Sequence, residues 1–222
     1  MLPQEDRMTT RQQLLQTLRT RGSGSIAELS QALSITEMGI RRHIQALERE
    51  GLVAATVAKQ AMGRPMSIYR LTPRADDLFP KKYPQLALDL LGELDGAPDG
   101  EAIIGRMFAG RRDKLIARHK AAMAGATLEE RVAELAAIQQ AGGYMSHWER
   151  DGAGERYTLY EFNCPIAQVA GKYREACSCE HQLFEALLGA DVKRTECIAD
   201  GGAKCTYAIS RKSAETERAA TS

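Results

Sequence analysis

Residues 25–51, SIAELSQALSITEMGIRRHIQALEREG, carry the pattern that decides the fold of the first part of the chain. Ser25 can cap a short helix, and Glu28, three residues later, completes a capping box. After a tight turn, Thr36 can cap a longer helix, which ends at Gly51, where a left-handed residue is needed. A short helix, a tight turn and a longer helix that bears arginines predict a helix-turn-helix unit.

The segments on either side extend this unit. Residues 10–20, TRQQLLQTLRT, place leucines on one stripe of a further helix. Residues 52–59, LVAATVAK, and 67–72, SIYRLT, alternate as β-strands do and flank a turn rich in glycine and proline. Three helices followed by a hairpin predict a winged helix. Arg64 falls at or near the tip of the wing, where it can reach the minor groove or the backbone of DNA.

The longer helix has two different faces. Ile40, Ile44 and Leu47 share one face and are expected to pack on the other two helices. Arginine and glutamine side chains elsewhere on the helix can reach base edges, and threonine at its start can reach phosphates. The residues predicted to bind double-stranded DNA are Thr36, Glu37, Met38, Arg41, Arg42, Gln45 and Arg64. The alternative is a module that mediates protein contacts only, which the arginines of this set disfavour.

Charge and composition support this interpretation. Residues 9–84 carry 12 Lys and Arg against six Asp and Glu, a net of +6, which leaves −5 for the rest of a chain whose formal charge is +1. This distribution of charge favours a nucleic-acid partner for the basic N-terminal segment and not for the acidic remainder of the chain. No apolar run approaches the length of a membrane span, and the start, MLPQEDRMTT, lacks the pattern of a secretory signal, so we expect a cytoplasmic protein.

The middle of the chain predicts amphipathic helices and no catalytic arrangement. We find no nucleophile–base pair, phosphate loop or paired acids, and we expect a protein that is not an enzyme. Helix-turn-helix proteins usually bind two half-sites as symmetric pairs, so the central helices are expected to form a homodimer interface. The predicted fold class is mainly α with a small β content (α+β). The predicted segments are a winged helix (9–82), a helical connector and dimerisation region (83–143) and a cysteine-containing sensor domain (144–211).

All five cysteines fall in the last 59 residues, and the first 163 residues have none. In the cytosol, clustered thiols more often bind metal or do redox chemistry than form structural disulfides. The surrounding pattern predicts a hairpin around residues 151–154, a helical segment from Pro165 to about Leu188, and a second hairpin around residues 200–202. A small α+β domain results.

The spacing of the cysteines restricts how they can meet. Cys177 lies about 20 Å along a helix from Cys164, so residues 165–172 and 173–188 cannot form one straight helix if both thiols serve one site. Cys179 points about 200° round the helix from Cys177. Thiolates of Cys164, Cys177, Cys197 and Cys205 could surround a four-iron cluster. A zinc site, a disulfide switch and separately packed cysteines are the alternatives. Cys179, Glu180 and His181 are alternative fourth ligands.

Over nearly its whole length the chain resembles the iron–sulfur-sensing winged-helix repressors of the SUF operon type (SufR-like regulators). The resemblance rests on IRRHIQALEREGLV (40–53), GRPMSIYRLTPRADDLFPKKYPQLALDLL (63–91), and CPIAQVAGKYREAC (164–177) followed by GGAKCTYAI (201–209). It implies a homodimeric repressor of cluster-assembly genes whose affinity for operator DNA depends on an iron–sulfur cluster, [4Fe–4S] or [2Fe–2S].

The resemblance also implies part of the ligand set. Cys164, Cys177 and Cys205 match the family's cysteine positions. Cyanobacterial members have a further cysteine where this chain has residues 189–191, Gly-Ala-Asp, and here Cys197 appears instead. The fourth ligand and the cluster type therefore stay open. The alternative function is a winged-helix regulator that binds zinc or an apolar small molecule in place of a cluster.

Overall fold

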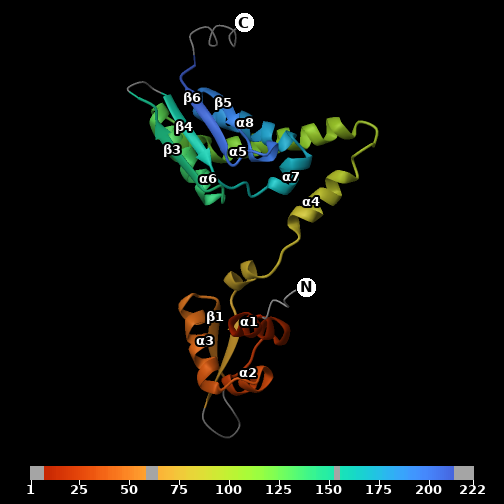
Figure 1. The fold of residues 1–222 in the computed structure, drawn as a ribbon, viewed down its shortest axis with the longest axis vertical. Coiled ribbons are helices and arrows are strands. Elements are labelled where there is room, and N and C mark those ends of the chain that lie inside the picture. The colour runs from red at the N-terminus through yellow and green to blue at the C-terminus, as the bar shows by residue number, and fades with distance from the viewer. Residues whose placement is uncertain (1–7, 59–64, 153–155, 213–222) are drawn as a thin grey trace, which may run out of the picture. The chain divides into compact units, whose positions relative to one another are not determined.

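The computed structural model of the chain describes residues 8–58, 65–152 and 156–212. The chain divides into two compact units, Met1–Lys81 and Lys82–Ser222, and each is considered by itself. The content is mixed α and β, as predicted (Figure 1). Within the described residues, no helix is long and apolar enough to cross a membrane.

The first unit is a three-helix bundle with a β-hairpin. Its elements are α1 (Thr10–Arg21), α2 (Ile26–Leu33), α3 (Glu37–Arg49), β1 (Val53–Ala58), β2 (Met66–Leu71) and the 3-10 helix η1 (Pro73–Leu78). The predicted capping box of Ser25 and Glu28 starts α2, and the Thr36 hydroxyl caps α3. Gly51 follows α3 with φ of 72°, which confirms the predicted left-handed stop.

The core of this unit is built from the predicted helix stripes. Ile40, Ile44 and Leu47 of α3 are at most 1% exposed and pack with leucines of α1 and α2. The hairpin is antiparallel and runs from the pair Val53–Leu71 to the pair Ala58–Met66. Burial of one apolar face of each helix therefore fixes which residues of α3 remain on the surface.

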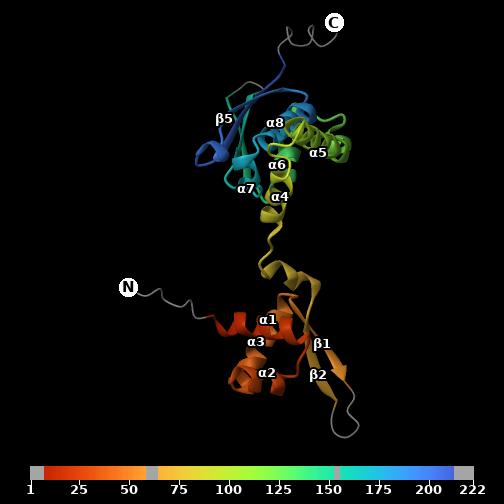
Figure 2. The same ribbon diagram turned by 90° about the vertical axis from the view of Figure 1, so that its right-hand side faces the viewer.

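The second unit is a four-stranded antiparallel sheet with helices on one face (Figure 2). Its strand order is β3-β4-β6-β5, and α6 and α8 contribute most of the helical side of the core. The elements are α4 (Tyr83–Gly92), α5 (Gly100–Met123), α6 (Leu128–Ala141), β3 (Ser146–Arg150), β4 (Arg156–Glu161), α7 (Ala167–Lys172), α8 (Glu175–Leu188), β5 (Asp191–Glu196), the 3-10 helix η2 (Ile198–Asp200) and β6 (Cys205–Ser210).

Two features of this unit bear on the predicted organisation. The predicted connector (83–143) and sensor domain (144–211) share one unit, because α5 packs on α8 and α6 packs on β3, β4 and α8. The segment after Cys164 is broken into α7 and α8, as the cysteine spacing predicted. The break falls at Tyr173, whose backbone is extended (φ −113°, ψ 97°).

Candidate functional site

The outward face of α3 carries the residues predicted to contact DNA. Met38 is 76% exposed, and Arg41 and Glu37 form an ion pair of 3.4 Å in which both side chains are more than half exposed. A salt bridge this exposed contributes little to folding, so both groups remain available to a ligand. The exposed residues of the predicted set are Thr36, Glu37, Met38, Arg41, Arg42 and Gln45.

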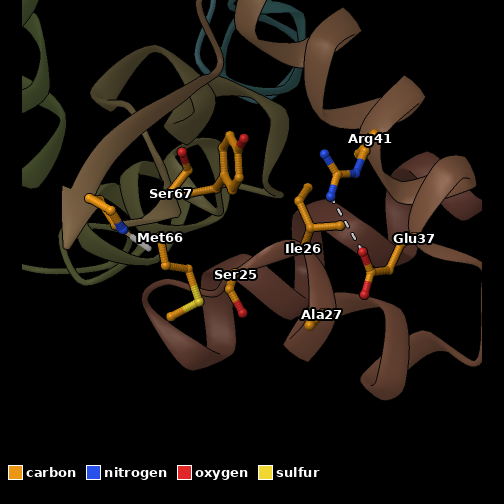
Figure 3. A pocket seen from close by; sticks show the side chains of 9 residues that line it. Ser25, Ile26, Ala27, Glu37, Arg41, Met66 and Ser67 are labelled. Atoms are coloured by element: carbon orange, nitrogen blue, oxygen red, sulfur yellow. Dashed lines mark hydrogen bonds and ion pairs between the residues drawn. The ribbon is translucent and has the colours of Figure 1, made fainter. Parts of the chain in front are cut away.

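Arg41 also lines an opening between the starts of α2 and α3 and strand β2 (Figure 3). The opening has a volume of about 430 Å³, and Figure 3 shows Arg41 reaching toward Glu37 at its edge, with Ser67 and Met66 on the opposite side. A cationic side chain beside a concave surface, next to the start of an exposed helix, suits the phosphates and base edges of a duplex.

The hairpin is tied to the helices by an isolated antiparallel β-bridge. Gly24 and Tyr69 exchange two backbone hydrogen bonds of 3.0 and 2.9 Å, which joins β2 to the residue before the cap of α2. The register of the wing is therefore fixed relative to the helix-turn-helix. Arg64, predicted for the tip of the wing, lies outside the described residues.

The second site is the cysteine centre. All five cysteines are free thiols. Cys164 follows β4, Cys177 lies in the first turn of α8, Cys197 follows β5 and Cys205 begins β6. Cys177, Cys197 and Cys205 are at most 7% exposed, and Cys164 is half-buried. The fold therefore brings thiols from four separate segments into the interior of one unit.

Cys197 is the centre of this group. A negative charge on its sulfur would raise the pKa of the Cys177, Cys205 and Cys164 thiols, so Cys197 lies near all three. Burial, followed by the charge of Cys197, raises the pKa of Cys177 to about 11. Burial, partly offset by the Ile198 amide, raises the pKa of Cys205 to about 12. Cys177 and Cys205 are consequently protonated at neutral pH when nothing binds them, and binding a metal would have to displace their protons.

Several groups around the thiols favour negative charge on sulfur. Arg174 donates from Nη2 to Cys197 Sγ at 3.8 Å and also pairs with Asp200 at 2.5 Å. The Ile198 backbone N–H donates to Cys205 Sγ at 3.4 Å. Arginine and amide donors of this kind stabilise thiolates and tune metal–sulfur clusters.

The donor set and its spacing can be compared with what a metal group requires. Among the described residues, no three His, Cys, Asp or Glu side chains are arranged to hold a single metal ion. A zinc ion with bonds of about 2.3 Å needs all its sulfur ligands within about 4 Å of one another. A four-iron cluster is wider and takes four thiolates, so the four cysteines fit an iron–sulfur cluster in ligand chemistry.

The alternative ligands have other partners. Cys179 points toward α5, where Arg111 Nη1 lies 3.7 Å from its sulfur. His181 Nε2 lies 2.8 Å from the Val192 carbonyl oxygen. Glu180 is buried and accepts from the Tyr207 hydroxyl at 3.4 Å. Cys197 is thus the residue that the fold places beside Cys177 and Cys205.

Sequence reasoning missed a buried pair of acids behind the cysteines. Glu161 is 1% exposed, Gln139 Nε2 donates to its Oε1 at 2.7 Å, and no residue that the structure describes donates to its Oε2. Burial and the nearby Glu180 raise the pKa of Glu161 to about 8. The sequence of β4 contained the signal. Successive side chains of a strand point to opposite faces, so Glu161 shares the buried face with Tyr157 and Leu159.

Comparisons with known proteins agree with the first unit. Residues 10–63 match a family model described as an HTH domain. No curated protein matches the chain. Among solved structures, one similar chain is BpsR of Bordetella bronchiseptica, described in a study of the regulation of its DNA binding by 6-hydroxynicotinic acid. It is 22% identical, the match covers 50% of this chain and 79% of that one, and the TM-score is 0.28, too low for a conclusion about the fold of either unit.

The fold and the family match together define the class of the protein. The HTH match spans α1 to α3, and the hairpin that follows makes the domain a winged helix. The exposed arginines of α3 lie where such domains contact the major groove. The chain is a DNA-binding transcriptional regulator.

Proposed function

We propose that this regulator is a repressor that holds an iron–sulfur cluster, [4Fe–4S], on Cys164, Cys177, Cys197 and Cys205, and that cluster occupancy changes its affinity for operator DNA. The observation that carries the proposal is that one unit encloses thiols from four segments near Cys197, three of them buried and that of Cys164 half-buried. A bound cluster would supply iron–thiolate bonds that are lost under iron limitation or oxidation. The role proposed is binding and not catalysis.

The residues between the first two cysteines offer a route from the cluster to the DNA-binding unit. Helix α7 lies between Cys164 and Cys177 and contacts both η2 and α4. Lys172 Nζ pairs with Asp95 at 2.8 Å, and the Tyr173 hydroxyl donates to the same carboxylate at 3.2 Å. Helix α4 follows directly on the first unit in the chain, so a shift of α7 is passed to the segment that holds the winged helix.

Homodimer formation is a further part of the proposal. Exposed apolar side chains of α4 and α5 surround an apolar hollow of about 310 Å³. Leu90 is 64% exposed and Met107 is 55% exposed, and both line this hollow. Burying them against a second copy would remove apolar surface from water and present two α3 helices to a symmetric operator. Leu90→Arg is expected to shift the protein toward monomer in sedimentation equilibrium.

The test is purification without oxygen, followed by a visible spectrum and assays of iron and sulfide. We expect about four iron and four sulfide per chain. Replacing Cys164, Cys177, Cys197 or Cys205 by Ser should remove the visible absorbance and leave a folded protein. Cys179→Ser, in the same helix as Cys177, is the matched control and should retain it.

The possible outcomes separate the proposal from its rivals. About two iron and two sulfide would retain the function and change the cluster type. One zinc per chain, or a colourless protein without metal, would overturn the iron–sulfur assignment. Full absorbance in a Cys197→Ser protein would remove Cys197 from the ligand set.

A further inference from the structure

The second unit contains a cavity that neither the cysteine centre nor the DNA-binding face uses. It has a volume of about 400 Å³, within the range of small-molecule sites, and lies between α5, α6, α8 and the turn after Cys164. Most of its wall is apolar. The apolar lining includes Leu115 of α5, Leu135 and Ile138 of α6, and Leu183 and Leu187 of α8.

One side of the cavity is cationic. Arg111, Arg118 and His119 line it from α5, at positions i, i+7 and i+8, which share one face of a helix. Arg111 is engaged by Cys179 at 3.7 Å. For the Arg118 side chain we find no hydrogen bond or ion pair with another residue of the described part of the chain. Its guanidinium is therefore available to a ligand.

The buried polar groups of the cavity already have partners. Gln139 is 6% exposed and donates to Glu161, and Glu180 is 7% exposed and accepts from Tyr207. Each of these two side chains therefore already makes a hydrogen bond within the protein. A ligand in this cavity would therefore contact apolar side chains over most of its surface and the guanidinium of Arg118 at one side.

We propose that this cavity binds a small amphipathic carboxylate, an organic acid whose apolar chain or ring packs between α5, α6 and α8 while its carboxylate pairs with Arg118. Guanidinium and carboxylate match in charge and in planar, bidentate geometry. The apolar wall supplies the burial that a short aliphatic or aromatic body requires.

The position of the cavity gives the ligand a means of regulation. Pro165 and Ile166 line it, and they directly follow Cys164, whose carbonyl oxygen accepts from Ala167 at 3.0 Å. A bound acid would contact the segment that places the Cys164 thiol. This regulatory consequence rests on the proposed function, whereas binding of the acid does not.

The test is calorimetric titration of the full-length protein with octanoate and, separately, with 1-octanol, which has the same chain length and no charge. Each titration is run on protein with its metal and after chelation, so that loss of the cluster and loss of ligand binding are read separately. Arg118→Gln is expected to weaken octanoate binding about tenfold, the contribution of one charged hydrogen-bonded contact. Arg106→Gln, an exposed arginine of α5 outside the cavity, is the matched control.

A second variant tests the location. Ile138→Trp should fill the cavity and abolish octanoate binding, with unchanged circular dichroism. Octanoate binding that exceeds octanol binding and falls only in the Arg118 and Ile138 variants would support the site. If neither compound gives a binding signal in calorimetry at millimolar concentration, the proposal of a ligand site in this cavity is overturned. Equal binding of octanol, or equal loss in the Arg106 variant, would overturn the assignment of a carboxylate on Arg118.

Discussion

Replacing the buried carboxyl of Glu161 by an amide should stabilise the metal-free protein at neutral pH. Glu161 is 1% exposed, has an unpartnered Oε2, and has its pKa raised to about 8 by burial and by Glu180. The unfolded chain releases this proton near the ordinary pKa of 4.5, and the folded chain keeps it. The stability that this group contributes is therefore complete below pH 4.5 and is lost as pH rises through 8.

The size of the effect follows from the difference in proton binding. Each pH unit in which the unfolded state lacks a proton that the folded state holds lowers the free energy of unfolding by about 1.4 kcal/mol. Between pH 5 and 8 the wild-type protein should lose roughly 4 kcal/mol from Glu161 alone. Glu161→Gln removes this loss, and its amide can still accept from Gln139. The variant should exceed wild type by about 3 kcal/mol at pH 7 and match it near pH 5.

The assay is urea unfolding of reduced, metal-free protein at pH 5, 6, 7 and 8, followed by circular dichroism. Glu149→Gln, at an exposed carboxylate of β3, is the control and should run parallel to wild type. Because Glu161→Gln and wild type differ in one titrating group, the difference between their two curves reports the effect of Glu161, and the Glu149 variant shows the effect of losing an exposed carboxylate. A Glu161→Gln curve parallel to wild type across this range would refute the argument from burial.

Three further changes have expected results. Leu47→Ala, at a side chain that is 0% exposed, should lower the free energy of unfolding by about 2–5 kcal/mol in urea titration, and a loss near zero would contradict the described core. Gly202→Ala places a Cβ 2.8 Å from the Cys197 carbonyl oxygen and should lower the iron content of the purified protein. Gly105→Ala, whose Cβ would enter open space, is the control, and equal iron content in both variants would argue against Cys197 as a ligand. Arg41→Ala should weaken operator binding about 5- to 150-fold in gel shifts with an unchanged visible spectrum, and unaltered affinity would remove Arg41 from the interface.

The local features of the fold were accessible from the sequence because they depend on neighbouring residues. The capping box at Ser25 and the left-handed Gly51 are set by contacts within three or four residues. The break between Cys164 and Cys177 followed from the rise of a helix, which limits how far apart two residues can be and still share a site.

The features that were not predicted depend on contacts between distant segments. The Asp95–Lys172 ion pair joins the turn after α4 to the end of α7, and no local pattern relates these two segments. The charge effect of Glu180 on Glu161 requires β4 and α8 to contribute to one core, and no local pattern relates these two elements. Helix α5 was predicted as amphipathic, but its partner α8 and the cavity between them depend on tertiary packing.

The most direct test of the central claim is the affinity of the protein for one operator fragment, selected from genomic DNA, measured with and without its cluster. Protein purified without oxygen and the same protein after chelation are titrated by fluorescence anisotropy at one fixed salt concentration. We expect the two affinities to differ at least about tenfold, and we expect Cys197→Ser protein to behave like the chelated form. Equal affinities, with iron and sulfide verified in the first sample, would contradict control of DNA binding by the cysteine centre.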